Sequence, residues 1–456
     1  MLARLIASLR ARRAQDWVRD IDVAAKRNDW DNAWQTAHKA IAAFPLDPVI
    51  RLRAAMLCER RGDHGATIEH ARALIRVSAE LWAAHAIRVR ALHHSGRYAE
   101  AISAAGEAEA LAEARRAPNP VRSDLSLWHG LAKLRAMRTA EAQTHFVRAY
   151  ELDRRSDISL QLATYARVMA FRWPAEREAL EPCVEASSRA SRLAPDIVYF
   201  FVEQSDAPHP SARGVDYFEL LRLSAASARK AMPGARVRLM TDFSTSVPEG
   251  IVDDVLRYPV PSDRLMVARL LANAQFLDSG DFRHDTVFVD PAIYFLRDCR
   301  DAFRGEFDLG YTWRSDTVES RQDIMPLYAG VLFAPEGRGK PAAAFLRECL
   351  ACLEALQGFP AVVDAYPQGI ERWWGDQLAP AAVLGWQQFY DIILPGRSDR
   401  VRVNGTVLRF FDAEAYNYAV REQSRDELAG RCIVNFKGER KRAMPQFHRW
   451  FSQRSD

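Results

Sequence analysis

The stretch HDTVFVDPAIYFLRD, residues 284–298, decides how the second half of this 456-residue chain folds. It contains a short run of β-branched and aromatic residues, Val287–Val289, which ends at the acidic residue Asp290. A second apolar run, Ile293–Leu296, follows closely. Short apolar runs bounded by polar residues are typical of buried strands. We therefore expect a buried strand that ends at Asp290, so that this carboxylate lies at the carboxyl end of the strand.

Strand-like and helix-like segments alternate before this stretch. The runs IVYFFV (197–202) and ARVRLMTD (235–242) have the composition of further strands. The patterns YFELLRLSAASARKA (217–231) and DRLMVARLLANAQFL (263–277) are helical and separate the strands. This alternation predicts an α/β layer with a largely parallel sheet.

Polar residues gather at the ends of the expected strands. Glu203 and Asp206 lie at or after the end of the first strand, Thr241 and Asp242 end the second, and Asp290 ends the third. In open α/β sheets, ligands bind outside the carboxyl ends of the strands. We therefore expect these residues to face a ligand. The alternatives are a simple turn at Thr241 and Asp242 and a plain strand-end cap at Asp290.

The first part of the chain repeats. The segments NDWDNAWQTA, GDHGATIEHA and GRYAEAISAA begin at Asn28, Gly62 and Gly96, 34 residues apart. Further copies begin at Met137, after a longer interval, and at Phe171. A period near 34 residues is a signature of stacked helical hairpins, with a turn residue between two helices. The pattern resembles the tetratricopeptide repeat family over roughly residues 20–195.

The repeats define the expected domains. We expect an all-α helical-repeat solenoid over residues 1–195 and an α/β domain over residues 196–456. The resemblance to tetratricopeptide repeats implies a concave groove that holds a protein or glycan acceptor, or a partner subunit. The alternative is that the array serves only as a packing partner for the second half.

The composition excludes several classes of function. The formal net charge is +4, and no dense stripe of basic residues interleaves with aromatics, which argues against a nucleic-acid partner. The six cysteines are too sparse for a disulfide scaffold, which favours a reducing, cytoplasmic location. Cys349 and Cys352 lie in an apolar helical pattern and are expected on a buried helix face. The eleven histidines show no cluster of metal-ligand type.

The sequence contains no run of 18 apolar residues, so no membrane-spanning helix is expected. Its first segment, MLARLIASLRARRAQDW, places Leu2, Leu5, Ile6 and Leu9 on one helical face. We expect this helix to pack on the repeats that follow it. The alternative is a weak peripheral membrane contact.

Four motifs of the second half resemble those of one enzyme class, in the order of that class. They are VFVDPAIYFLRD (287–298), PLYAGVLFAP (326–335), WWGDQLAP (373–380) and VNFKGERKRAM (434–444). They are similar to the Asp-x-Asp, Asn-Ala-Gly-Val, Asp-Gln and terminal His-Phe-x-Gly-x-x-Lys-Pro motifs of GT-A type nucleotide-diphospho-sugar transferases, most closely glycosyltransferase family 8 and its bacterial relatives. The resemblance implies a GT-A, Rossmann-like α/β fold. It also implies a glycosyltransferase that moves a sugar from a nucleotide sugar to a cell-surface glycan or protein acceptor.

The resemblance further implies roles for individual residues. Asp290, Asp376 and Gln377 are expected beside the reacting sugar, as the catalytic group. Basic side chains are expected at the diphosphate, because negative charge grows on the leaving oxygen. With the strand-end residues included, the expected donor site consists of Glu203, Thr241, Asp242, Arg264, Arg269, Gly330, Asn435, Lys437, Gly438 and Lys441.

The sequence departs from the family's metal-binding pattern at two positions. The family holds a divalent metal, Mn or Mg, between two acids and a histidine. Ala292 stands where the second acid is expected and Asn435 where the histidine is expected, so that Asp290 alone is retained. Hard cations require several oxygen ligands. We therefore expect little metal dependence, with Lys437 and Lys441 neutralising the diphosphate.

Other interpretations of these residues stay open at this point. Asp376 could be a helix N-cap, Arg264 and Arg269 could form a solvated helix face, and the segment around Lys437 could be a basic tail. The rival function is a non-catalytic scaffold, in which a degenerate transferase domain accompanies protein-binding repeats. The missing ligands at Ala292 and Asn435 favour this rival.

Overall fold

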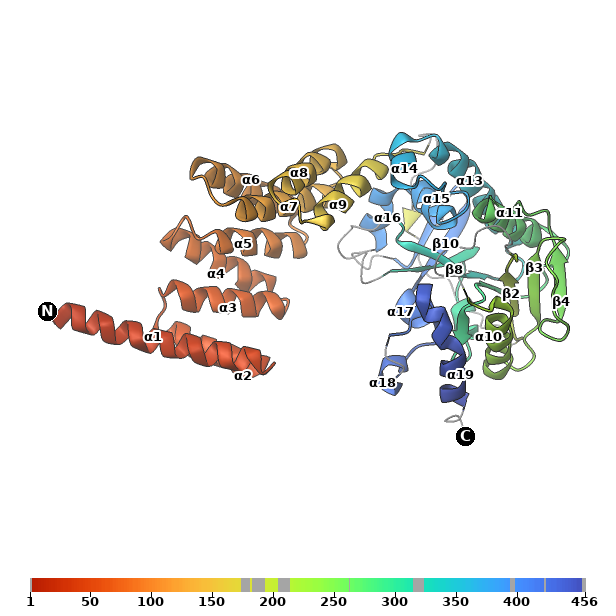
Figure 1. The fold of residues 1–456 in the computed structure, drawn as a ribbon, viewed down its shortest axis with the longest axis horizontal. Helices are drawn as coiled ribbons and strands as arrows, with labels where there is room; N and C mark the ends of the chain where they lie inside the picture. Colours follow the sequence, from red (N-terminus) through yellow and green to blue (C-terminus); the bar gives the residue numbers. More distant parts are fainter. Residues whose placement is uncertain are drawn as a thin grey trace. The chain divides into compact units, whose positions relative to one another are not determined.

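A computed structural model describes residues 2–173, 181–182, 193–203, 214–261, 263–314, 324–393, 398–421 and 424–452. The chain divides into two compact units, Met1–Ala170 and Phe171–Asp456 (Figure 1). The first unit consists of helices, and the second contains a large mixed sheet surrounded by helices. The expected fold class, an all-α repeat array followed by an α/β domain, is confirmed.

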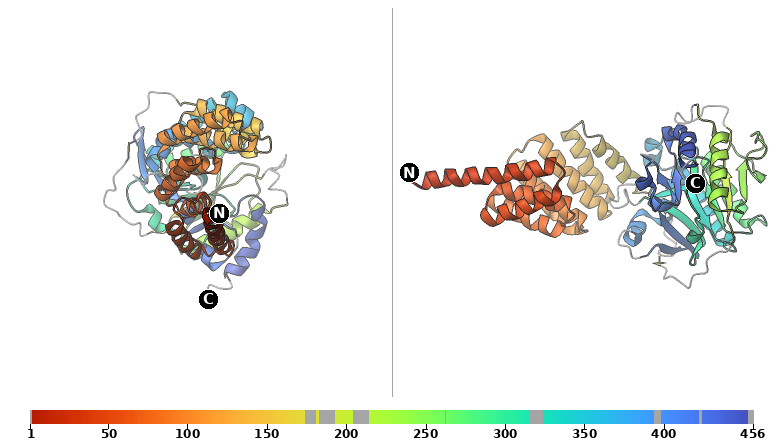
Figure 2. Two further views of the ribbon diagram at one scale, coloured as in Figure 1. Left: turned by 90° about the vertical axis from the view of Figure 1, so that its left-hand side faces the viewer. Right: turned by 90° about the horizontal axis from the view of Figure 1, so that it is seen from below.

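The first unit is a succession of helices, each of which packs against the next one along the chain (Figure 2). The helices are α1 (Leu2–Lys26), α2 (Trp30–Ala43), α3 (Pro48–Arg60), α4 (His64–Val77), α5 (Trp82–His94), α6 (Tyr98–Ala114), α7 (Asn119–Arg135), α8 (Thr139–Leu152) and α9 (Asp157–Val168). Small residues permit the close approach, since Ala33, Ala37 and Ala40 of α2 are all fully buried. From residue 13 onward α1 packs in the same way, with Ile21 and Ala24 in a core shared with α2 and α3.

The 34-residue period appears in the backbone of the turns. Asn28, Gly62, Gly96 and Met137 begin the four copies, and their φ angles are +58°, +74°, +76° and +56°. This left-handed conformation reverses the chain between helices and is easiest for glycine and asparagine. Met137 adopts the same conformation although it is neither glycine nor asparagine.

The division between the units lies earlier than the boundary predicted at residue 195. Phe171 contacts the ring of Phe359, and Trp173 donates a hydrogen bond to Glu348 at 3.1 Å. Strand β1 (Glu181–Pro182) pairs with a strand of the large sheet. The segment that begins at Phe171, which the prediction places in the repeats, therefore belongs to the second unit. The fifth copy predicted at Phe171 is not helical over residues 171–173, and its remainder lies outside the described residues.

The large sheet of the second unit has the order β1-β9-β10-β7-β8-β5-β2-β3-β4. Its other strands are β2 (Asp196–Phe200), β3 (Val237–Thr241), β4 (Asp254–Arg257), β5 (Thr286–Val289), β7 (Leu309–Trp313), β8 (Leu327–Ala334), β9 (Arg400–Val403) and β10 (Thr406–Asp412). The block β5-β2-β3-β4 is parallel throughout, and β7 and β10 are also parallel. Strand β8 runs antiparallel to both of its neighbours. All residues of β5 are buried, as its apolar composition predicts.

The strand order reverses beside β2. The chain proceeds from β2 to β3 and β4 on one side and then returns to β5 on the other side. Because β2 and β5 are parallel, their carboxyl ends open at the same edge of the sheet. Such a switch point is where open α/β sheets bind ligands. Asp290 directly follows β5 and therefore borders this crevice.

A small second sheet joins the segment after Asp290 to the C-terminal region. It has the order β11-β12-β6, with β11 (Tyr418–Ala419), β12 (Ile433–Asn435) and β6 (Ile293–Phe295). Asn435 pairs with Ile293, so two motifs far apart in sequence lie side by side.

Helices and short helical turns complete the second unit. They are α10 (Tyr217–Ala231), α11 (Leu265–Asp278), η2 (Arg300–Phe303), α13 (Gly339–Gln357), α14 (Pro360–Ala365), α15 (Gly375–Leu384), α16 (Trp386–Ile393), α17 (Ala413–Tyr416), α18 (Arg425–Leu428), η3 (Gly438–Ala443) and α19 (Met444–Ser452). Cys349 and Cys352 are fully buried in α13, which confirms the buried helix face. Within the described ranges, every helix is too short or too polar to cross a bilayer.

Candidate functional site

Three charged side chains meet beside the carboxyl end of β5. Arg269 Nη1 lies 3.0 Å from Oδ1 of Asp290 and 3.1 Å from Oδ2 of Asp376. Arg269 belongs to α11 and also donates to the carbonyl oxygen of Ala329 in β8. The side chains of Arg269 and Asp376 are 8% and 2% exposed, whereas that of Asp290 is 38% exposed. The cluster is therefore buried at Asp376 and open to solvent at Asp290.

A tight backbone approach places Asp376 in this cluster. Trp374 adopts a φ of +73° and forms the N-cap of α15, so Asp376 is not the capping residue. A Cβ atom on Gly375 would come within 2.4 Å of the carbonyl oxygen of Ile370. Only glycine fits between these segments, and the helix start is thereby fixed. Asp376, the second residue of α15, then contacts Arg269.

The cluster contains one guanidinium group and two carboxylates, so its charges do not balance. Burial raises the pKa of Asp376 to about 6; Arg269 opposes this shift, and Asp290 reinforces it. Oδ1 of Asp376 is buried and has no hydrogen-bond partner among the described residues. Buried polar atoms are seldom left unsatisfied. This oxygen is therefore suited to accept a hydrogen bond from a bound hydroxyl group.

Two buried asparagines form a polar wall next to Asp290. Asn435 donates to Asn417 Oδ1 at 2.9 Å, and Asn417 donates to Thr312 Oγ1 at 2.9 Å. Gly330 lies against them, because a Cβ atom there would come 2.9 Å from Asp290 Oδ2 and 3.4 Å from Asn435 Nδ2. The absence of a side chain at Gly330 lets these polar groups approach one another.

Basic side chains border a cavity of about 520 Å³ that begins at this wall. Asn417 lines the cavity together with Arg314, Arg421, Lys437 and Arg440, and the acids Glu414 and Glu439 partly balance their charge. Lys437 Nζ lies 3.1 Å from the ring centroid of Tyr328, and the Arg314 guanidinium lies 4.5 Å from the same centroid. Aromatic faces attract cations. Tyr328 thus holds two positive charges at the cavity.

Lys441 occupies a different place from Lys437. It donates a hydrogen bond to the hydroxyl of Tyr217 at 2.9 Å. The ring of Tyr217 in turn stacks on Phe201, with ring centroids 5.3 Å apart. Phe201 follows β2, so Lys441 lies beside the strand end that faces β5 across the switch point.

The side chains around Asp290 do not fit a divalent metal ion. Asp290 is already paired with Arg269, and the amide nitrogen of Asn435 is bonded to Asn417. Ala292 is 3% exposed and packs in an apolar cluster with Leu220, Leu223 and Phe436, among others. One carboxylate and an amide oxygen fall short of the six or more oxygen ligands that hard cations prefer. The cation at this position is the guanidinium of Arg269.

The other expected donor residues lie at the crevice edge or serve local structure. The carboxylate of Asp242 accepts hydrogen bonds from Ser244 and, at 2.8 Å, from the Thr245 N–H, which is the arrangement of a turn. Burial raises its pKa, but these hydrogen bonds prevail and the pKa is lowered overall. Thr241 is fully buried, and the backbone N–H of the exposed Glu203 donates to Thr245 Oγ1 at 3.0 Å.

Three further expected residues have less defined surroundings. Arg264 immediately precedes α11 and makes no ion pair with a described residue. Gln377 is half-buried next to Asp376, and Gly438 adopts a φ of +56° at the rim of the cavity. The strand-end residue Asp206 lies outside the described residues.

Sequence reasoning missed two groups of residues. Asn417 and Arg314 belong to the wall and the cavity but lie outside the four motifs, and Tyr328 lies within PLYAGVLFAP (326–335) without a predicted role. The expectation that the histidines form no metal-type cluster is wrong, because His129 and His145 meet at Glu109. The members of each group lie on different elements, so their spacing in the sequence gave no signal.

Comparisons with known proteins find structural similarity at low TM-scores only. No family model and no curated protein matches the sequence. The N-terminal part is similar to the solved MamA protein, at 18% identity over 34% of this chain and 80% of MamA, with a TM-score of 0.30. It is also similar to a tetratricopeptide repeat protein of Thermus thermophilus, at 17% identity over 34% of this chain and 81% of that one, with a TM-score of 0.28.

The rest of the chain is similar to solved glycosyltransferases. The galactosyltransferase LgtC, in complex with donor and acceptor sugar analogues, is 11% identical over 57% of this chain and 96% of its own, with a TM-score of 0.33. At such TM-scores the likeness carries no argument about function. The fold assignment rests on the helical hairpins and on the strand order described above.

Proposed function

We propose that the second unit is a GT-A type glycosyltransferase domain, which binds a nucleotide sugar at the switch point between β2 and β5 and transfers the sugar with little dependence on metal. One observation carries the proposal. The cluster of Arg269, Asp290 and Asp376 opens toward solvent at Asp290, and the adjoining polar wall leads to a cavity bordered by basic side chains.

Neutralisation of the diphosphate is assigned to protein cations. As the sugar departs, negative charge grows on the bridging oxygen of the nucleoside diphosphate and must be met by fixed positive charge. Lys437 and Arg314, both held at the ring of Tyr328, supply that charge in the cavity. Lys441 supplies a further charge at the end of β2. Lysine and arginine bind phosphate oxygens through charge-assisted hydrogen bonds.

Recognition of the sugar is assigned to the acids. Asp290 is partly exposed beside the cavity, and Asp376 holds a buried acceptor oxygen without a donor among the described residues. Sugar hydroxyls are donors of the required kind. Arg269 fixes both carboxylates, so that they are oriented before the sugar arrives. Gln377, the neighbour of Asp376, is placed to bind a further hydroxyl.

Binding of the acceptor is assigned to the first unit. Stacked helical hairpins form extended surfaces that hold proteins or peptides, and a protein or glycan acceptor held there would be presented to the transferase unit. Five cysteines are unpaired in the described structure, which suits a reducing, cytoplasmic setting. The alternative of a weak membrane contact rests on residues 1–12, whose side chains lie outside the described set.

A non-catalytic scaffold is the second candidate. It is favoured by the burial of Ala292 in an apolar cluster, which removes the second acid expected of the family. A scaffold with a degenerate site would bind no nucleotide sugar, whereas the proposed enzyme binds one and hydrolyses it slowly without an acceptor. Binding and hydrolysis together therefore separate the two candidates.

The test combines ligand binding with one variant and one matched control. The full chain is titrated calorimetrically with UDP, GDP, ADP and CDP and with their common sugar conjugates. Lys437→Ala is expected to weaken binding by about tenfold to a hundredfold, since hydrogen bonds to charged groups contribute about 1.5–3 kcal/mol. Lys230→Ala is the control, because Lys230 is exposed near the end of α10 and does not line the cavity. Equal effects of both substitutions would contradict the assignment of Lys437.

A further inference from the structure

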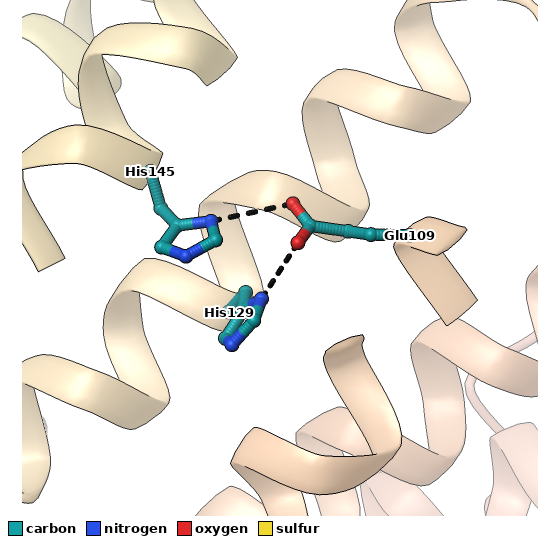
Figure 3. Close-up of side chains that lie close together, drawn as sticks. All are labelled: Glu109, His129 and His145. Atoms are coloured by element: carbon teal, nitrogen blue, oxygen red, sulfur yellow. Dashed lines mark hydrogen bonds and ion pairs between the residues drawn. The ribbon is translucent and has the colours of Figure 1, made fainter. Parts of the chain in front are cut away.

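A buried cluster of metal-ligating side chains lies inside the repeat array, outside the proposed donor site. Glu109 of α6, His129 of α7 and His145 of α8 converge (Figure 3). Glu109 Oε2 lies 2.7 Å from His129 Nδ1, and Oε1 lies 3.4 Å from His145 Nδ1. One potential ligand atom from each residue lies within 4.8 Å of the others. We propose that these three residues bind a divalent transition-metal ion of the zinc type, which joins three consecutive helices of the array.

The burial of the cluster supports a dedicated site. The side chains of Glu109, His129 and His145 are 11%, 8% and 15% exposed. A carboxylate on an ordinary solvated helix face would be far more exposed, as Glu107 is at 61% on the same helix. Burying an ionised carboxylate is costly unless it is paired with a cation. A positive charge held at the two imidazoles would offset this cost for Glu109.

The arrangement of the two rings favours a shared cation. Their centroids are 3.9 Å apart, so the two imidazoles lie almost in contact. If both rings carried a proton charge, they would repel each other at this distance. A metal ion held by two neutral imidazoles and one carboxylate avoids this repulsion. Figure 3 shows both rings presenting Nδ1 to the carboxylate, so that a nitrogen of each ring lies beside a carboxylate oxygen.

The donor set selects the class of metal. Two imidazole nitrogens and one carboxylate suit zinc and neighbouring first-row ions, whereas magnesium and calcium prefer oxygen ligands throughout. Ligand atoms about 2.0–2.2 Å from a tetrahedral zinc ion lie roughly 3.3 Å apart. The 3.4 Å between Glu109 Oε1 and His145 Nδ1 matches this separation, whereas the 2.7 Å between Glu109 Oε2 and His129 Nδ1 is roughly 0.6 Å shorter. Because the two distances involve different carboxylate oxygens, the side chains must shift to hold one ion. A fourth position is left for water.

Neighbouring groups hold the ligands in place. The hydroxyl of Ser126 donates to the carbonyl oxygen of His145 at 3.2 Å and lies 3.5 Å from its Nδ1. A Cβ atom on Gly106, one turn before Glu109, would contact the ring of His129 at 3.7 Å. The helix α6 therefore approaches α7 closely enough for the carboxylate to reach both rings.

The first measurement uses the full chain after removal of metal with a chelator. Co²⁺ is added in small steps and visible absorption is recorded, because tetrahedral cobalt absorbs much more strongly than hydrated cobalt. We expect one equivalent to bind with a visible spectrum and to be displaced by Zn²⁺, and Zn²⁺ to raise the melting temperature, since metal binds only the folded array. Absence of a saturable spectrum in the wild-type chain overturns the proposal, whatever the variants do.

Variants then assign the bound metal to these residues. His145→Gln and Glu109→Gln keep the side-chain size and are expected to weaken binding by tenfold or more, with helical content retained by circular dichroism. His38→Ala is the control, because His38 is exposed on α2 and remote in sequence from the cluster. Unchanged metal affinity in both cluster variants, or an equal loss in His38→Ala, overturns the assignment. A zinc-dependent rise in melting temperature that persists in His145→Gln does the same.

Discussion

Replacing Ala292 by aspartate tests why the second acid of the metal motif is missing. Ala292 is 3% exposed and packs with Leu220, Leu223 and other apolar side chains, so a carboxylate introduced there would be buried without a partner. Burial of this kind raises the pKa of a carboxyl group by about 3–5 units. Each pKa unit corresponds to about 1.4 kcal/mol. The free energy of unfolding of Ala292→Asp is therefore expected to be about 4–5 kcal/mol lower than that of the wild type at pH 7.5. It is not expected to create a metal site.

The loss of stability must depend on pH with a definite sign. A carboxyl group whose pKa is higher in the folded state than in the unfolded state contributes stability at low pH and loses it as pH rises through the folded pKa. The difference in free energy of unfolding between the wild type and Ala292→Asp should therefore increase by about 3 kcal/mol between pH 5.0 and pH 7.5. Ala292→Val, the control, adds bulk without charge and should cost about 1–3 kcal/mol at both pH values.

The assay is scanning calorimetry of the full chain, in which the transition of the second unit is followed at both pH values, with and without Mn²⁺. The two units need not unfold together, so transitions are compared and not a single global midpoint. A variant with wild-type stability at pH 7.5 that gains Mn²⁺-dependent stabilisation would show that position 292 faces the donor site. That result would refute the argument from burial.

Three further predictions concern the turns, the acid cluster and the repeats. Gly62→Ala should destabilise the first unit by about 1 kcal/mol in thermal unfolding, because Gly62 has a φ of +74° and nothing crowds the site. The control Gly65→Ala, within helix α4, should stabilise the unit by up to about 1 kcal/mol. Equal effects of the two substitutions would contradict the role of the turn. The free energy of unfolding of Asp376→Asn should rise relative to that of the wild type as pH increases from about 4 to about 6. The reason is that the pKa of Asp376 is raised in the folded state, so that ionisation of this carboxyl group destabilises the wild type. Free energies from denaturant titrations that change with pH in the same way in both proteins would contradict this. Deleting residues 1–170 should abolish transfer to the native acceptor and spare slow donor hydrolysis, as measured by release of nucleoside diphosphate; equal loss of both would mean that the array is needed to fold the second unit.

The repeat array could be predicted because its signals are local. Each copy carries a turn residue with a positive φ, as at Gly62 and Gly96, followed by small residues that recur on the buried face. The strand that ends at Asp290 was predictable for the same reason, since its apolar run is short and uninterrupted. The boundary at residue 195 was misplaced because nothing in the sequence around Trp173 shows that its indole bonds to Glu348.

The site could be predicted only in part, because its geometry depends on contacts across the fold. The Asp-Gln motif indicated Asp376, but the contact between Asp376 and Arg269 requires α15 and α11 to meet, which the sequence does not state. The same holds for Asn417, which reaches Asn435 only through the pairing of β11 with β12. The motif comparison places Ala292 at the position of a missing ligand, and only the structure shows that its side chain belongs to an apolar cluster.

The most direct test of the central claim is calorimetric titration of the full chain with nucleoside diphosphates and their sugar conjugates, once in EDTA and once in Mn²⁺. We expect at least one nucleotide sugar to bind in EDTA, with an affinity within about threefold of that in Mn²⁺, because Lys437, Arg314 and Lys441 supply the positive charge. Binding that vanishes in EDTA and returns with Mn²⁺ would contradict the assignment of these cations. Absence of binding under both conditions would contradict the proposed transferase and leave the scaffold in its place.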